Sequence, residues 1–120
     1  MDRTFFFFFY FKLFNIQVFT NKEVLKGLLS YLYESSKNGL TVKEMDIAFD
    51  YFKRSSEFIP GDDTIVRVNI YKLRSLLDAY YLEEGKKDSI VLEIPKGSYS
   101  LKFVGKGQAT GKNIRKRTRN

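Results

Sequence analysis

The chain has 120 residues, which is the length of a single domain. It is 43% hydrophobic and 17% aromatic, enough to fill a core and too apolar for a wholly disordered protein. It contains no Cys and no His, which excludes Cys/His zinc sites, disulfide bonds, thiol nucleophiles and triads with an imidazole base. No paired-carboxylate or Ser–Lys motif is present. We therefore expect a cytoplasmic binding protein without catalytic residues, metal or cofactor.

The net charge of +7 comes from 21 basic and 14 acidic residues, and it is concentrated at the C-terminus. Residues 106–120 hold six basic side chains and no acid, and removing them leaves 15 basic against 14 acidic residues. Residues 105–120 show no periodic pattern, and we predict a disordered basic tail. Such a tail would contact nucleic-acid phosphates non-specifically, through Arg115, Lys116, Arg117 and Arg119.

The N-terminal segment, residues 1–18, is unusually rich in Phe. Its apolar stretch is shorter than the roughly 20 residues of a membrane span, and Lys12, Asn15 and Gln17 interrupt it. Three interpretations stay open: an extra β-strand, sequence upstream of a misassigned start, or a membrane or secretion segment. We favour a protein without a membrane span.

A first helix is predicted over residues 21–35. Thr20 and Glu23 have the spacing of a capping box, and Asn38-Gly39 supplies a stop. The apolar side chains recur at helical spacing, at Val24, Leu25, Leu28, Leu29, Leu32 and Tyr33.

A second helix is predicted over residues 42–54, where Thr41 and Glu44 repeat the capping-box spacing. Its apolar face consists of Ile47, Ala48, Tyr51 and Phe52. Residues 55–61 are expected to form a loop that ends in Pro60-Gly61.

The longest predicted helix covers residues 63–83, with good N-cap residues at its start and Gly85 at its end. At 100° per residue one side is apolar, with Val66, Ile70, Leu73, Leu77, Tyr80 and Tyr81. The opposite side is polar and basic, with Arg67, Val68, Tyr71, Lys72 and Ser75, and Arg74 on its flank. One face is therefore expected to be core and the other to be exposed.

Two strands are predicted over residues 90–94 and 99–103. They flank Pro95-Lys96-Gly97-Ser98, which is typical of a tight hairpin turn in which Gly supplies a positive φ. Three helices followed by a hairpin is the element order of a winged helix-turn-helix, an α+β fold. We place this domain at residues 19–104.

The segment DTIVRVNIYKLRSLL from Asp63, the pair Tyr80-Tyr81 and the segment IVLEIPKGSYSLKF from Ile90 resemble a bacterial family. These are the winged-helix domains of tetratricopeptide- or adenylate-cyclase-linked transcriptional regulators, which are related to OmpR/PhoB-type effector domains. The resemblance covers about residues 19–103. It implies DNA binding by the third helix and the hairpin wing. Lys72 stands where that family has an arginine.

Together, the helix face and the resemblance predict a set of DNA-binding residues. Long cationic donors on a helix in the major groove, interleaved with side chains that reach base edges, are what DNA recognition requires. The predicted contacts are Arg67, Asn69, Tyr71, Lys72, Arg74, Ser75, Lys96 and Lys102. The expected partner is double-stranded DNA, bound by a homodimer if the sites are repeated half-sites.

Other interpretations of these residues stay open. Arg67, Lys72 and Arg74 could form a solvated helix face, and Arg74 could instead pair with an acid in a structural role. Tyr71 could stack on a base or merely cover the helix. As a whole, the domain could instead serve as a protein-docking module.

Overall fold

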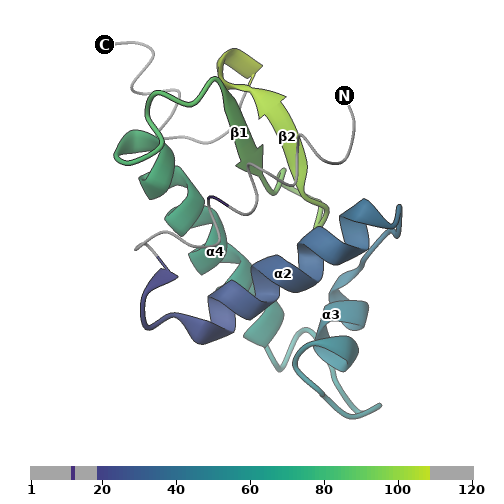
Figure 1. Cartoon of the computed structure of the whole chain (residues 1–120). Coiled ribbons are helices and arrows are strands. Elements are labelled where there is room, and N and C mark those ends of the chain that lie inside the picture. The colour runs from purple at the N-terminus through teal and green to yellow at the C-terminus, as the bar shows by residue number, and fades with distance from the viewer. Residues whose placement is uncertain (1–11, 13–18, 109–120) are drawn as a thin grey trace.

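The computed structural model describes residue 12 and residues 19–108, which have an α+β architecture (Figure 1). The elements in chain order are α2 (Glu23–Lys37), α3 (Glu44–Asp50), α4 (Ile65–Leu82), β1 (Ile90–Glu93), β2 (Lys102–Gly105) and the 3-10 helix η2 (Lys106–Gln108). Helix α4 is the longest of these and contacts α2, α3 and β1. The predicted order of three helices and an antiparallel hairpin is confirmed.

The core lies where the inner sides of the helices and the hairpin meet. All six residues that the pattern placed on the inner side of the third helix are buried. The largest side chains that are less than 2% exposed are Leu28, Leu29, Leu32, Ile47, Val66, Ile70, Leu73, Val91 and Leu92. The predicted inner face of α2 is confirmed except at Val24, which is 52% exposed.

Helix α2 begins later than predicted, and the capping box of Thr20 and Glu23 is not formed. The N-cap residue is Lys22, which makes no side-chain capping bond. A tight turn precedes it, in which the Lys22 N–H donates to the Phe19 carbonyl at 3.1 Å and Asn21 has a φ of 62°. Asn tolerates this left-handed conformation, and the turn allows Phe19 to be buried. The predicted stop is confirmed, with Asn38 as C-cap and Gly39 at a φ of 72°.

Helix α3 is shorter than predicted at both ends. The Lys43 N–H donates to Asp46 at 2.8 Å, in place of the expected pair of Thr41 and Glu44. At the other end Lys53 has a φ of 55°, and the Arg54 N–H donates to the Ala48 carbonyl at 2.8 Å. This left-handed residue ends the helical path after seven residues.

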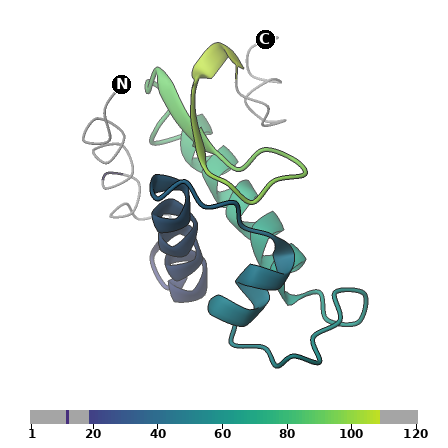
Figure 2. The same cartoon turned by 90° about the vertical axis from the view of Figure 1, so that its right-hand side faces the viewer.

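The hairpin differs from the predicted one in the position of its second strand. The register pairs Ile90 with Gly105 and Glu93 with Lys102, so the connection is the hairpin loop, residues 94–101, and not a four-residue turn. Ile94 and Leu101 leave the ladder because they are buried in the core. The two strands therefore diverge at the hairpin loop, whose buried residues pack on the helices before the chain continues into β2 (Figure 2).

The regular structure also continues beyond the expected domain boundary at residue 104. Strand β2 includes Gly105, η2 follows, and the Lys106 N–H donates to the Ser89 carbonyl at 2.9 Å. The Phe-rich segment, apart from Lys12, and residues 109–120 lie outside the described residues, so the possible N-terminal strand and the tail contacts stay predictions. Among the helices of the described part, none has the length and apolar character needed to cross a membrane.

Gly85 is required by packing, and not by backbone conformation. Helix α4 ends at Leu82, and a Cβ atom at Gly85 would lie 2.3 Å from the buried ring of Tyr80. Gly85→Ala is expected to lower the free energy of unfolding by about 1–3 kcal/mol, because the ring must move in a packed core. Gly61→Ala is the matched control, since no atom lies within 4 Å of the added carbon. Equal urea midpoints for the two variants would contradict this.

Candidate nucleic-acid interface

Helix α4 exposes a narrow stripe of side chains. Val68, Tyr71, Lys72 and Ser75 follow one another at i, i+3, i+4 and i+7, and we call these four the outer face of α4. All four are exposed, and Tyr71 is 70% exposed. Within α4, Lys72 is the one basic side chain for which the structure records no hydrogen bond or ion pair.

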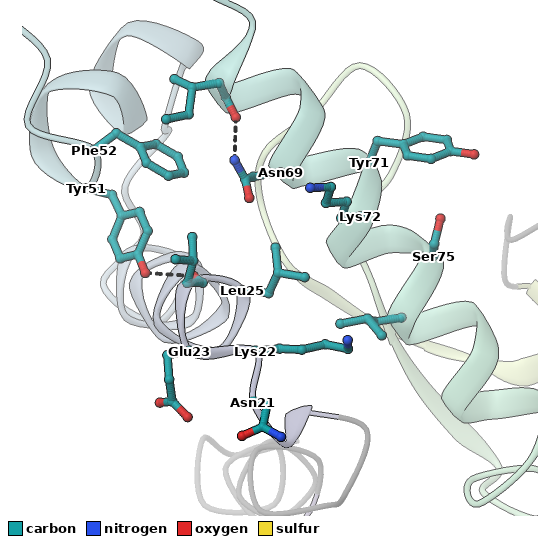
Figure 3. A pocket seen from close by; sticks show the side chains of 13 residues that line it. Asn21, Lys22, Glu23, Leu25, Tyr51, Phe52, Asn69, Tyr71, Lys72 and Ser75 are labelled. Atoms are coloured by element: carbon teal, nitrogen blue, oxygen red, sulfur yellow. Dashed lines mark hydrogen bonds between the residues drawn. The ribbon is translucent and has the colours of Figure 1, made fainter.

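A hollow of about 1170 Å³ lies beside this face, between the start of α2, the end of α3 and α4. Its walls include apolar and aromatic side chains together with two lysines, Lys22 and Lys72. Figure 3 shows Lys72 directed toward the hollow and Tyr71 directed away from it. The Tyr51 hydroxyl closes one side by donating to the Val24 carbonyl at 2.7 Å.

Sequence reasoning missed Asn21 and Lys22 as members of this region, although both line the hollow. They precede α2, some fifty residues away from Lys72 in the sequence, and only the packing of α2 against α4 brings them near. No local pattern could have found them. Glu23 also lines the hollow and partly offsets the two lysine charges.

Arg67 was predicted to contact DNA, but in the structure its guanidinium group binds other residues of the chain. Its Nε donates to Glu44 at 3.1 Å, and its Nη2 donates to the Pro60 carbonyl. These bonds tie the start of α4 to the start of α3 and to the loop between them. The guanidinium group thus holds the two helices together, although half of the side chain is exposed.

The loop before α4 has a second ion pair of the same kind. Arg54 donates from Nε to Asp63 at 2.8 Å, and the other oxygen of Asp63 accepts the Ile65 N–H at 3.1 Å. The Arg54 hydrogen bond, followed by the backbone bond, holds the pKa of Asp63 below its usual value. Asp63, which precedes the N-cap residue Thr64, therefore satisfies one of the free N–H groups at the start of α4 and joins that end to Arg54.

Two other predicted contacts on α4 are also bound to their own chain. The Asn69 side-chain amide donates to the Ile65 carbonyl at 2.8 Å, one helical turn back. Arg74 is half-buried and donates to three backbone carbonyls of the hairpin loop, and no acid in the described part of the chain pairs with it. Burial lowers the pKa of Arg74 from its ordinary value.

The hairpin carries the two remaining lysines of the predicted set. Lys96 is exposed beside Gly97, whose φ of 77° confirms the expected positive value. Lys102 is exposed at the start of β2, opposite Glu93 in the register. The structure thus leaves Tyr71, Lys72, Ser75, Lys96 and Lys102 exposed, and it uses Arg67, Asn69 and Arg74 internally.

Comparison of the chain with protein-family models, with curated protein sequences and with solved structures gives no match.

Proposed function

We propose that the chain is a winged-helix DNA-binding domain that acts in transcription regulation. The observation that carries this proposal is the outer face of α4, which is exposed along the middle of an 18-residue helix. Such a helix is about 27 Å long, and its diameter suits the major groove, which is about 12 Å wide. Its Tyr, Lys and Ser side chains can donate hydrogen bonds to base edges or phosphates.

In this proposal each exposed residue has a distinct role. Lys72 holds a phosphate or a single guanine acceptor, because an ammonium group lacks the planar fork of arginine. Tyr71 and Ser75 reach base edges or sugars on either side of it. Lys96 and Lys102, on the hairpin that serves as the wing, bind the neighbouring backbone. Lys22 adds a phosphate contact across the hollow.

The short outer face reads few base pairs, so recognition of an operator requires more than one domain. We therefore propose binding as a homodimer to repeated half-sites. The basic tail adds affinity that is sensitive to salt and indifferent to sequence. The chain has no catalytic role in this proposal.

The test is fluorescence anisotropy of a labelled duplex against the full chain over a salt series. A parallel variant carries glutamine at Lys112, Arg115, Lys116, Arg117 and Arg119, which removes every basic side chain after η2 and keeps the chain length. With Lys22, Lys72, Lys96 and Lys102 on phosphates, the slope of log affinity against log salt should stay near −3 to −4 in the variant. Binding that disappears with the tail charges would refute DNA recognition by the folded part.

A protein-docking module is the second candidate, and one observation favours it. The outer face of α4 includes Val68, which is 43% exposed, next to the highly exposed ring of Tyr71. Both arginines of α4 are engaged within the protein, so this face is less basic than the sequence predicts. Tyrosine is enriched at the centre of protein interfaces. In that case Tyr71→Ala would abolish partner binding, and DNA binding would depend on the tail alone.

A further inference from the structure

Arg74 lies on the side of α4 that faces the hairpin loop. Its Nε donates to the Ile94 carbonyl at 3.0 Å, and its Nη2 donates to the carbonyls of Pro95 at 3.0 Å and Ser98 at 3.1 Å. One guanidinium group thus binds three backbone acceptors within five residues of the loop. A contact of this kind fixes the path of the backbone as well as its distance from the helix.

The hydrogen-bond donors of Arg74 are largely consumed by these contacts. A guanidinium group has five N–H donors: one on Nε and two on each terminal nitrogen. The three bonds use the Nε donor and both donors of Nη2, which leaves only the pair on Nη1. Bidentate reading of guanine needs parallel N–H bonds from two different nitrogens. Arg74 cannot offer such a pair while it holds the loop.

Near its tip, the loop makes few other hydrogen bonds. The Ser98 N–H donates to the Pro95 carbonyl at 3.1 Å, and the Ser100 N–H donates to the Ser98 hydroxyl at 3.1 Å. Lys96 and Gly97 stand exposed between the carbonyls that Arg74 binds. The direction in which Lys96 leaves the surface is therefore set by the segment that the guanidinium group holds.

We propose that Arg74 is a positioning residue, which holds the hairpin loop against α4 so that Lys96 is presented beside the outer face of that helix, and that it makes no base contact itself. This inference rests on the proposed function for what Lys96 binds. Its structural part, the fixing of the loop, can be measured without any nucleic acid. Lysine cannot replace Arg74, because one ammonium group cannot span three carbonyls in the planar arrangement of a guanidinium group.

The first experiment measures amide hydrogen exchange by NMR in the free full-length chain and its Arg74→Lys and Arg74→Gln variants. The Ser98 and Ser100 amides should exchange about tenfold faster in Arg74→Gln, and also faster in Arg74→Lys, because a charged donor no longer holds the loop. Amides in the middle of α4 should keep their protection, which shows that the variants are folded. Lys72→Gln is the matched control and should leave loop exchange unchanged. Unchanged loop exchange in both Arg74 variants would overturn the proposal.

The second experiment is a double-mutant cycle on binding to a labelled duplex, with the tail charges replaced as above. If Arg74 acts through Lys96, then Lys96→Gln and Arg74→Lys each weaken binding, and the combined variant is no weaker than Lys96→Gln alone within about twofold. Losses that multiply would identify Arg74 as a separate DNA contact and overturn the positioning role. If the parent chain binds no duplex, the proposed function fails, and loop exchange alone decides whether Arg74 fixes the loop.

Discussion

Replacing Lys72 by glutamate is expected to weaken duplex binding by about 10- to 100-fold at low salt in the variant without tail charges. The substitution removes one phosphate contact and places a negative charge at the centre of the outer face of α4. Lys72 is exposed and makes no recorded hydrogen bond or ion pair, so the free energy of unfolding should change by less than about 0.5 kcal/mol. The milder Lys72→Gln should reduce the salt slope by about one.

Lys87→Glu is the matched control for this experiment. Lys87 is exposed in the turn after α4, at the opposite end of the helix from the hollow, and its substitution makes the same change in net charge. We expect the affinity of this variant to stay within about twofold of the parent, since a distant exposed charge is screened by salt. Equal losses for the two variants would mean that net charge alone governs binding.

Arg67 is a poorer target for such a test than the sequence indicates. Its ion pair with Glu44 and its bond to Pro60 join α4 to α3, so charge reversal there disturbs the fold and the surface together. A loss of binding in an Arg67 variant would not separate these two causes. Lys72 has the advantage that its replacement breaks no recorded hydrogen bond or ion pair.

The sequence predicts the inner side of α4 correctly because hydrophobic burial follows the helical period. Val66, Ile70 and Leu73 are placed by spacing alone, and each is at most 1% exposed. The same reasoning fails for Arg67 and Arg74, whose long side chains reach partners 20 or more residues away in the sequence. A charge on the polar side of a helix looks identical in sequence whether it faces solvent or a loop carbonyl.

The hairpin shows a second limit of local patterns. Pro95 and Gly97 correctly indicate a chain reversal, and Gly97 has the expected positive φ. The predicted start of the second strand is wrong because Leu101 belongs to the core. Its N–H donates to the Ser36 hydroxyl at 2.9 Å. That bond crosses 65 positions of sequence, so the length of the hairpin loop is decided by α2, outside the hairpin itself.

Raising the pH above about 10 is expected to destabilise the domain, because Tyr80 and Tyr81 are buried at the end of α4 with their rings in edge contact. Burial, followed by the nearby carboxylate of Asp88, raises the pKa of Tyr80 to about 12. Burial also raises the pKa of Tyr81 far above its ordinary value, and its hydroxyl accepts the Leu92 N–H at 2.8 Å. The folded state therefore keeps both phenols neutral at a pH where the unfolded chain ionises them.

The sign of the effect follows from these raised pKa values. The stabilisation that depends on the neutral phenols is fully present below about pH 10, the pKa of tyrosine in the unfolded chain. It is lost as the pH rises toward about 12. Each tyrosine contributes up to about 1.4 kcal/mol per pH unit, so the two together should lower the free energy of unfolding by about 3 kcal/mol between pH 10 and 11.5. Urea unfolding followed by circular dichroism at pH 8.5, 10 and 11.5 measures this loss.

Two variants separate the contributions of the two rings. Tyr80→Phe and Tyr81→Phe should each make the loss of stability between pH 10 and 11.5 smaller by about 1.5 kcal/mol, because each removes one ionisable group. Tyr81→Phe should also cost about 1–3 kcal/mol at pH 8.5, since it leaves the buried Leu92 N–H without its acceptor. If the free energy of unfolding falls equally with pH in the parent chain and in both variants, other groups cause the loss of stability at alkaline pH. Because the Tyr81 hydroxyl joins β1 to α4, duplex binding should be measured below about pH 10, where this contact keeps the hairpin in place.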